Sequence, residues 1–313
     1  MRPRRSDQPL TRFAPAKVNL SLQVLGKRED GFHELHTLMA PLSWGDRLRW
    51  TPVSAIPKAT DRGEQEFSFR LHPPAACHDG FSEIGVEEDN LVTRAARLLA
   101  DAAGVVAHGR IDLWKHTRPQ AGLGGGSSDA AAALLLLNKA WGLGFTKPRL
   151  ATLAARLGSD VPFFLAGSPA VCTGRGERVR AIGGLPALHL VVSQPHEGVP
   201  TADAFAELAR QNGNGDPIEA EERTRRLLNA LRAGRLRAFA ERTVNSLQGA
   251  AAALVRSIGD TLDRLAWAGC VGQWMTGSGS ACVGLAVNAA HARAIEGIMK
   301  AENNNNTFVT TTR

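Results

Sequence analysis

The chain has 313 residues and a formal net charge of +7, and 43% of its residues are hydrophobic and 21% charged. This length fits one large domain or two, and the composition excludes a disordered or collagen-like polymer. The longest apolar run, Ala130 to Leu137, is shorter than the ~20 residues that a membrane-spanning helix needs. The positive charge suits an anionic partner, and the four widely spaced cysteines are typical of a reduced, cytoplasmic protein.

The first predicted element is a half-buried strand from Lys17 to Leu25, where apolar and polar residues alternate. Two more strands are expected at 32–42 and 46–51, followed by extended segments and loops in the proline-rich stretch 53–88. Residues 1–12 are basic and lack the apolar core of a secretory signal, so we expect a disordered arm there.

Helices are expected in the next part of the chain. Asp89 or Asn90 can cap a helix that begins at Leu91, and a short strand is predicted at 110–115. A glycine-rich segment then opens directly into an apolar helix, and the many glycines at 167–184 indicate a domain boundary.

Four regions follow from this pattern. After the arm at 1–12 we expect an N-terminal domain at 13–168 and a C-terminal domain at 169–300. Residues 301–313 are polar and rich in asparagine and threonine, which predicts a flexible tail.

The strongest functional signal is the segment from Gln120 to Asp129, which has four glycines within five positions. Glycines let the backbone approach a ligand and turn its N–H groups inward, and a helix N-terminus attracts anions. Ser127 or Ser128 is expected to cap the helix, with hydroxyls available to phosphate or magnesium. The segment matches neither the P-loop nor the dinucleotide fingerprint. It predicts a phosphate loop of another kind, with a flexible hinge as the alternative.

Three segments together resemble the motifs of the GHMP small-molecule kinases: PAKVNLSL near the start, GLGGGSSDAA in the middle and GSGSACVG near the end. The segments GFHELHTL and LGSDVPFFLAG are similar to the branch of that family whose substrate is a cytidine-diphosphate-linked polyol. The resemblance covers most of residues 13–290. It implies an α+β protein with the two-domain GHMP kinase fold. The N-terminal nucleotide-binding domain would be ribosomal-protein-S5-domain-2-like, and the C-terminal domain a ferredoxin-like α/β sandwich.

The same resemblance implies a function. The protein would be an ATP-dependent kinase that uses Mg²⁺ and phosphorylates the 2-hydroxyl of the polyol in the non-mevalonate isoprenoid pathway. Asp160 matches the general base and Lys17 its electrostatic partner, although Asp160 alone also suits a turn before Pro162. Asn19, two residues after Lys17 on one strand face, is expected to bind the polyol.

The remaining site residues are carried over in the same way. Phe32 and His33 match the cytosine-binding position, Thr201 a substrate-side loop and Asn90 a position near the adenine. The other residues expected to bind ATP are Arg118, Pro119, Gln120, Ala121, Gly122, Leu123, Gly124, Gly125, Gly126, Ser127 and Ser128. Arg118 departs from the family pattern, since an apolar residue and then proline usually precede the glycines. No side chain is assigned as a direct metal ligand.

Two other functions are compatible with these motifs. One is another GHMP-type kinase, acting on mevalonate, homoserine or a sugar, although the G-F-H segment favours a cytosine pocket. The other is a catalytically silent nucleotide sensor, which the presence of both Lys17 and Asp160 disfavours. No run of basic residues interleaved with aromatics is visible, so we expect no nucleic-acid partner. A monomer or weak homodimer is expected.

Overall fold

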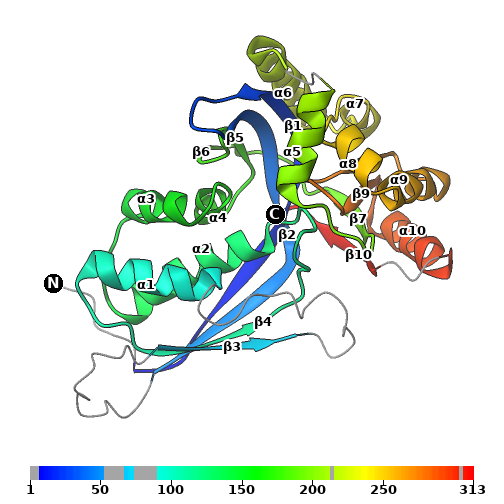
Figure 1. The fold of residues 1–313 in the computed structure, drawn as a ribbon. Helices are drawn as coiled ribbons and strands as arrows, with labels where there is room; N and C mark the ends of the chain where they lie inside the picture. The colour runs from blue at the N-terminus through cyan, green and yellow to red at the C-terminus, as the bar shows by residue number, and fades with distance from the viewer. Residues whose placement is uncertain (1–6, 53–66, 74–89, 212–214, 303–305) are drawn as a thin grey trace. The chain divides into compact units, whose positions relative to one another are not determined.

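The computed structural model describes residues 7–52, 67–73, 90–211, 215–302 and 306–313 (Figure 1). The chain divides into two compact units. Unit 1 comprises Met1–Pro15, Gly45–Pro119 and Gly125–Leu165, and unit 2 comprises Ala16–Trp44, Gln120–Gly124 and Ala166–Arg313. Two long paired strands, β1 (Leu10–Lys27) and β2 (His33–Thr51), contribute residues to both units.

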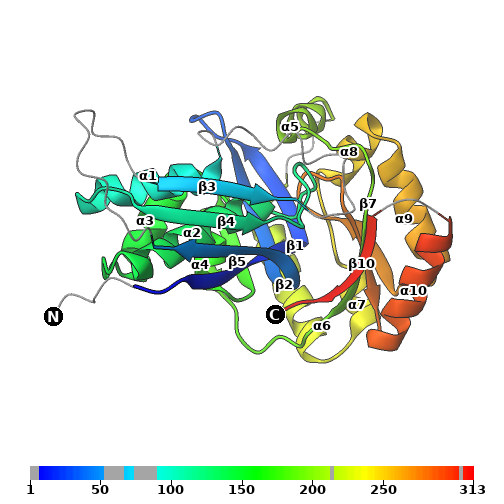
Figure 2. The ribbon, with the colours of Figure 1, turned by 90° about the horizontal axis from the view of Figure 1, so that it is seen from below.

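Unit 1 is a sheet with helices on one face. The second half of β2 pairs antiparallel with β4 (Gly109–Trp114), which pairs parallel with β3 (Phe67–His72). The helices are α1 (Leu91–Ala103), α2 (Gly125–Ala140), α3 (Lys147–Leu157) and α4 (Val161–Ala166). All four lie on the same side of the strands (Figures 1 and 2). Buried residues occur around the whole of α2, which makes it the central helix of this unit.

Unit 2 contains the remaining strands of the six-stranded sheet to which β3 and β4 belong, and a second sheet. The first half of β2 pairs antiparallel with β5 (Ala170–Gly174), and β5 pairs with β6 (Arg178–Ala181). A second, antiparallel sheet has the order β10–β7–β9–β8. Its strands are β7 (His189–Gln194), β8 (Gly272–Met275), β9 (Cys282–Ala286) and β10 (Asn306–Thr311). The helices are α5 (Thr201–Arg210), α6 (Pro217–Arg232), α7 (Leu236–Ala240), α8 (Gln248–Leu254), α9 (Ser257–Trp267) and α10 (Ala289–Glu302).

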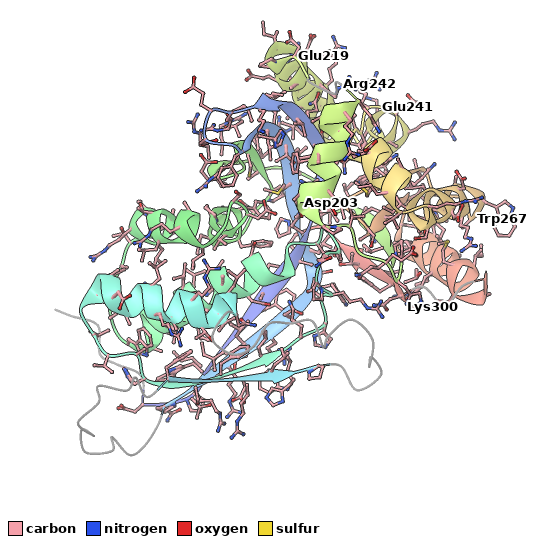
Figure 3. The ribbon with its side chains drawn as sticks, viewed as in Figure 1. Asp203, Glu219, Glu241, Arg242, Trp267 and Lys300 are labelled. Atoms are coloured by element: carbon pink, nitrogen blue, oxygen red, sulfur yellow. The ribbon has the colours of Figure 1, made fainter. Side chains whose placement is uncertain are left out.

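The second sheet is buried on both faces, because alternate residues of its strands enter two different clusters. Leu190 and Val192 pack with residues of α6 and α7, whereas Val191 packs with residues of α5, α8, α9 and α10. On the outer faces of these helices, Glu219 on α6 and Lys300 on α10 project outward (Figure 3). The apolar ring of Trp267 at the end of α9 also projects outward and is 70% exposed.

Neighbouring residues determine where α1 begins and ends and where α2 begins. The Asn90 side chain accepts a hydrogen bond from the Val92 amide at 2.9 Å, and Gly104 ends α1 with a φ of 64°. The predicted serine cap of α2 is wrong: the helix begins at Gly125, so Ser127 and Ser128 lie in its first turn. Gly124, with a φ of 68°, is the last left-handed residue before the helix, and helical geometry starts directly after it.

Two other expectations are corrected by strand pairing. The strands predicted at 32–42 and 46–51 are one continuous strand, β2, because β5 pairs with its first half and β4 with its second. The tail predicted as flexible contains β10, whose β-branched and aromatic residues pair with β7. Residues 10–12 of the predicted arm belong to β1, and residues 1–6 lie outside the described part.

In the described part of the chain, no helix is both long enough and apolar enough to cross a lipid bilayer.

Candidate functional site

In unit 2, residues 120–124 of the glycine-rich segment lie against the GSGSACVG segment at 277–284, called the third motif below, which begins in the loop between β8 and β9. Gly122 has a φ of 73°, and a Cβ at this position would lie 2.1 Å from the carbonyl oxygen of Thr276. A Cβ on Gly277, whose φ is 61°, would lie 2.8 Å from Gly122 Cα. The Ala281 amide donates a hydrogen bond to the Ala121 carbonyl at 3.1 Å. The two motifs therefore touch backbone to backbone, and a side chain at residue 122 or 277 would force them apart.

The backbone of this segment alternates in a way that suits an anion. Gln120, Gly122 and Gly124 have φ values of 52°, 73° and 68°, and Gln120 is the single non-glycine residue with positive φ in the described ranges. Alternation of left-handed with right-handed or turn conformations directs successive N–H groups into a concave, anion-binding nest. The Lys17 amide also donates to the Leu123 carbonyl at 2.9 Å. The segment is thus fixed to β1 as well as to the third motif.

Lys17 and Asn19 project from one face of β1, as the alternation predicts, and both are almost fully buried. Lys17 Nζ donates a hydrogen bond to Asn19 Oδ1 at 2.6 Å. The same oxygen accepts the Gly277 amide at 2.9 Å, and Asn19 Nδ2 donates to Thr37 Oγ1 at 2.8 Å. Asn19 therefore joins β1, β2 and the third motif and orients the Lys17 ammonium beside the glycines.

Two of the residues expected to bind the substrate, His33 and Thr201, lie at α5, and Phe32 directly precedes His33. Phe32, which precedes β2, is 47% exposed, and the Arg175 guanidinium carbon lies 4.8 Å from its ring centroid. The His33 ring stacks on Phe205 with centroids 4.4 Å apart and an interplanar angle of 19°. Thr201 is the first residue of α5, one helical turn before Phe205. Around the start of α5, unit 2 thus carries the stacked rings of His33 and Phe205 and the hydroxyl of Thr201.

A hydrogen bond joins α5 to the third motif, since Thr201 Oγ1 and Ser278 Oγ lie 3.0 Å apart. Sequence reasoning missed Phe205, Arg175 and the specific role of Ser278. Thr201 and Phe205 share an i, i+4 spacing, which was the available signal for Phe205. Arg175 has no such signal, because its contact with Phe32 depends on tertiary packing.

In unit 1, the first turn of α2 adjoins two other predicted positions. A Cβ on Gly126 would lie 3.4 Å from Leu91 Cδ1, so α2 begins beside the start of α1 and its cap, Asn90. A Cβ on Gly158 would lie 3.9 Å from Ser127 Oγ. The turn that carries the half-buried Asp160, directly before α4, therefore lies against the start of α2.

A buried charged network, which sequence reasoning missed, joins the two ends of the glycine-rich segment within unit 1. Lys115 Nζ donates to Asp46 Oδ2 at 2.5 Å and to Asp129 Oδ2 at 2.7 Å. Asp46 Oδ1 accepts the Thr117 amide at 2.8 Å. A Cβ on Gly125 would lie 2.8 Å from Lys115 Nζ. The chain entering the segment and the helix leaving it are thus held by one ammonium group.

Burial shapes the charges of this network. Desolvation raises the pKa of Asp129 to about 8, and Asp46 adds to the effect while Lys115 opposes it. Burial alone would lower the pKa of Lys115, but the carboxylates of Asp129 and Asp46 outweigh it and raise that pKa. Ser128 Oγ and Asp129 Oδ1 are buried and have no hydrogen-bond partner among the described residues. These are oxygen atoms of the kind that Mg²⁺ and its waters prefer.

The predicted site residues are therefore distributed over both units. Lys17, Asn19, Phe32, His33 and Thr201 lie in unit 2 with residues 120–124. Asn90, Arg118, Pro119, residues 125–128 and Asp160 lie in unit 1. Arg118 is half-buried, and its Nε has no hydrogen-bond partner within the described ranges.

Comparisons with known proteins identify the family of this chain. Residues 90–168 match the GHMP kinases N terminal domain, and residues 227–305 match the GHMP kinases C terminal domain. The 4-diphosphocytidyl-2-C-methyl-D-erythritol kinase of Deinococcus radiodurans is 38% identical over 283 residues, which cover 90% of this chain and 86% of that protein. The kinase of the same name from Salinispora tropica is 39% identical over 294 residues, covering 94% of this chain and 88% of the relative.

Solved structures extend the comparison. A crystal structure of 4-(cytidine 5'-diphospho)-2C-methyl-D-erythritol kinase has a TM-score of 0.76 and 36% identity, covering 97% of this chain and 99% of that one. A homoserine kinase from Cytophaga hutchinsonii, 18% identical with a TM-score of 0.70 over 98% of this chain and 95% of its own, shares the fold. The chain belongs to the 4-diphosphocytidyl-2-C-methyl-D-erythritol kinase family, within the two-domain α+β GHMP kinases.

Proposed function

We propose that this protein is a cytoplasmic kinase that transfers the γ-phosphoryl group of ATP to the 2-hydroxyl of 4-diphosphocytidyl-2-C-methyl-D-erythritol. This reaction belongs to the non-mevalonate route to isoprenoid precursors. The observation that carries the proposal is the Lys17 ammonium, held by Asn19 at 2.6 Å. It is 3.1 Å from the Cβ position of Gly277, in the motif that contacts the glycine-rich segment. A buried cation beside a ring of backbone N–H groups fits a site for a phosphoryl group.

ATP would be bound mainly by backbone groups. The N–H groups of residues 120–124 and of the first turn of α2 hold the phosphates, Asn90 lies on the adenine side, and Arg118 adds positive charge. When bound, Mg²⁺ neutralises charge on the phosphates. The hydroxyls of Ser127 and Ser128, in the first turn of α2, would bind the ion or its waters; that of Ser128 is buried without a hydrogen-bond partner among the described residues.

Asp160 would take the proton of the 2-hydroxyl as that oxygen attacks the γ-phosphorus and the bond to ADP breaks. Lys17 stabilises the negative charge that develops on the attacking oxygen. Asn19 positions the Lys17 side chain through its Oδ1, and that oxygen is itself fixed by the Gly277 amide.

Recognition of the cytidine would come from unit 2. Phe32 offers an exposed ring face for stacking on the cytosine, and His33 is fixed by Phe205 so that its polar atoms and backbone keep one orientation. The Thr201 hydroxyl would bind the polyol part of the substrate. We also propose a domain boundary near residue 168, where the N-terminal family match ends, with β10 included in the C-terminal domain because it pairs with β7. The compact units differ from this division, since residues 16–44 and 120–124 belong to unit 2.

The test is an acceptor comparison. The purified chain is supplied with Mg²⁺ and ATP and with the cytidyl polyol, mevalonate or homoserine in turn, and ADP release is measured. We expect rapid release with the cytidyl polyol alone. A preference for mevalonate or homoserine would assign the chain to another GHMP activity. ATP binding without release for any acceptor would favour a silent sensor.

A further inference from the structure

The face of the unit 1 sheet opposite its helices is open and basic. Helices α1 to α4 lie on one side of the strands, and no helix of the described chain covers the other side (Figures 1 and 2). Along β2, Leu48 and Trp50 are buried, whereas Arg47 and Arg49 are exposed. Because side chains alternate along a strand, both arginines project from the open face.

Strand register brings further arginines into the same rows. One row runs across three strands as His72, Trp114 and Arg47. The next row is Arg70, Asp112 and Arg49, and the third is Ser68, Arg110 and Thr51. Successive rows are about 6.6 Å apart, since residues two apart on a strand share a face. Four arginines thus cover three rows of one surface.

The positive charge of this face exceeds its negative charge. Asp112 is the one carboxylate in the three rows, and it accepts hydrogen bonds from Arg110 Nε at 3.0 Å and is 3.1 Å from His72 Nε2. For Arg47, Arg49 and Arg70 the structure shows no ion pair with any carboxylate of the described residues. Within the described ranges, the guanidinium groups of these three arginines are therefore not paired with a carboxylate.

Aromatic rings accompany these charges. Trp114 stacks on His72 with ring centroids 4.9 Å apart and an interplanar angle of 12°. Beside it lies a groove of about 540 Å³, whose lining includes Phe13, Arg47, Arg49, Trp114 and His116. A planar base can lie on a tryptophan or phenylalanine ring while its phosphate bonds a guanidinium group.

We infer that this open face binds single-stranded nucleic acid, with bases on Trp114 and Phe13 and phosphates on Arg47, Arg49 and Arg70. The positive charge of the arginines complements the phosphates of a nucleic acid, and the aromatic rings can stack on the unpaired bases of a single strand. Arg70, on the third strand, shares a row with Arg49 but does not line the groove, so an extended polyanion can contact more of these arginines than a ligand confined to the groove. The sequence-based expectation of no nucleic-acid partner overlooked this surface, because its arginines come from three separate strands.

The test measures binding of a fluorescent oligouridylate of about 16 nucleotides to the full chain by anisotropy. We expect binding that weakens steeply between about 50 and about 200 mM salt. The double variant Arg47→Ser/Arg49→Ser should lose at least about tenfold in affinity, and its salt slope should fall by about 1.4, because each phosphate contact on a single strand contributes about 0.7. Trp114→Ala should lose roughly 5- to 150-fold, the range for one stacked base.

A matched control separates a built surface from general basicity. Arg94→Ser/Arg97→Ser removes the same charge from exposed positions on α1, on the helical side of unit 1, and should bind nearly as wild type. Melting temperatures and kinase rates check that every variant is folded. Equal losses in both double variants, the absence of binding at low salt, or equal affinity for uridine monophosphate or duplex RNA would each overturn the inference.

Discussion

Gly122 and Gly277 touch through their backbones, so closely that a Cβ on Gly277 would lie 2.8 Å from Gly122 Cα. Residue 122 belongs to the segment expected to hold phosphate, and residue 277 belongs to the motif whose amide fixes Asn19. A single contact therefore couples the shape of the phosphate segment to the orientation of Lys17. The glycines at these two positions are required by space and by backbone conformation.

The first prediction tests this contact. Gly122→Ala places a Cβ 2.1 Å from the Thr276 oxygen and requires a φ of 73°, which L-residues rarely adopt. We expect ATP affinity to fall at least about tenfold and the melting temperature to decrease, because the strain of such a site costs on the order of 1–3 kcal/mol. Gly297→Ala is the control, because a Cβ added there on α10 would meet no heavy atom within 4 Å; it should keep ATP affinity and should not lower the melting temperature, since alanine favours a helix more than glycine does. Normal ATP affinity in Gly122→Ala would argue against the coupling.

The second prediction concerns the base. Asp160→Asn keeps the shape of the side chain but cannot accept the proton, so turnover should fall by ~10²–10⁴ while ATP affinity is retained. The rate is measured by ADP release and the affinity by calorimetry. Asp101→Asn, an exposed change on α1, should leave both unaltered. Near-normal turnover of Asp160→Asn would exclude Asp160 as the base.

Phe32 supplies the third prediction, which separates stacking from core packing. Its ring is 47% exposed, so Phe32→Ala should change the melting temperature little. Affinity for the cytidyl polyol should fall by roughly 5- to 150-fold, since stacking of a base is worth about 1–3 kcal/mol. Phe239→Ala, at a position with no exposure, should instead cost about 3–5 kcal/mol of unfolding free energy. Unchanged cytidyl affinity in Phe32→Ala would contradict the stacking role.

The fourth prediction is a pH dependence of stability in unit 2. His36 is buried, its Nδ1 lacks a hydrogen-bond partner among the described residues, and burial lowers its pKa, with Arg180 adding to and Glu221 opposing the shift. Below the ordinary value of ~6.5, the unfolded chain binds a proton that the folded chain excludes. The free energy of unfolding therefore falls as pH decreases through this range.

The measurement is the loss of melting temperature on moving from about pH 7.5 to about pH 5.5. This loss should be larger for the wild type than for His36→Gln, which keeps a polar side chain but cannot titrate. The same loss in both proteins would show that the lowered pKa of His36 has no effect on stability.

Sequence reasoning succeeded where local chemistry decides the structure. The Asn90 cap correctly indicates the helix that begins at Leu91. The strand expected at 110–115 is found at Gly109–Trp114. The glycine-rich segment and its helix are likewise encoded by neighbouring residues.

Sequence reasoning failed where the structure depends on pairing between residues far apart in the sequence. The continuity of β2 depends on two different partner strands, and β10 forms because β7 offers an unpaired edge. Lys115 reaches Asp46 across 69 positions, a pairing for which no sequence spacing gives a signal. The arginine-rich face of unit 1 arises in the same way, from the register of three strands.

The most direct test of the proposed activity is the structure of its product. The wild-type chain is incubated with Mg²⁺, ATP and 4-diphosphocytidyl-2-C-methyl-D-erythritol, and the product is analysed by mass spectrometry and phosphorus NMR. We expect one additional phosphate, as a monoester on the 2-hydroxyl of the polyol, formed together with ADP. A phosphate on another oxygen, or unchanged polyol beside bound ATP, would contradict it.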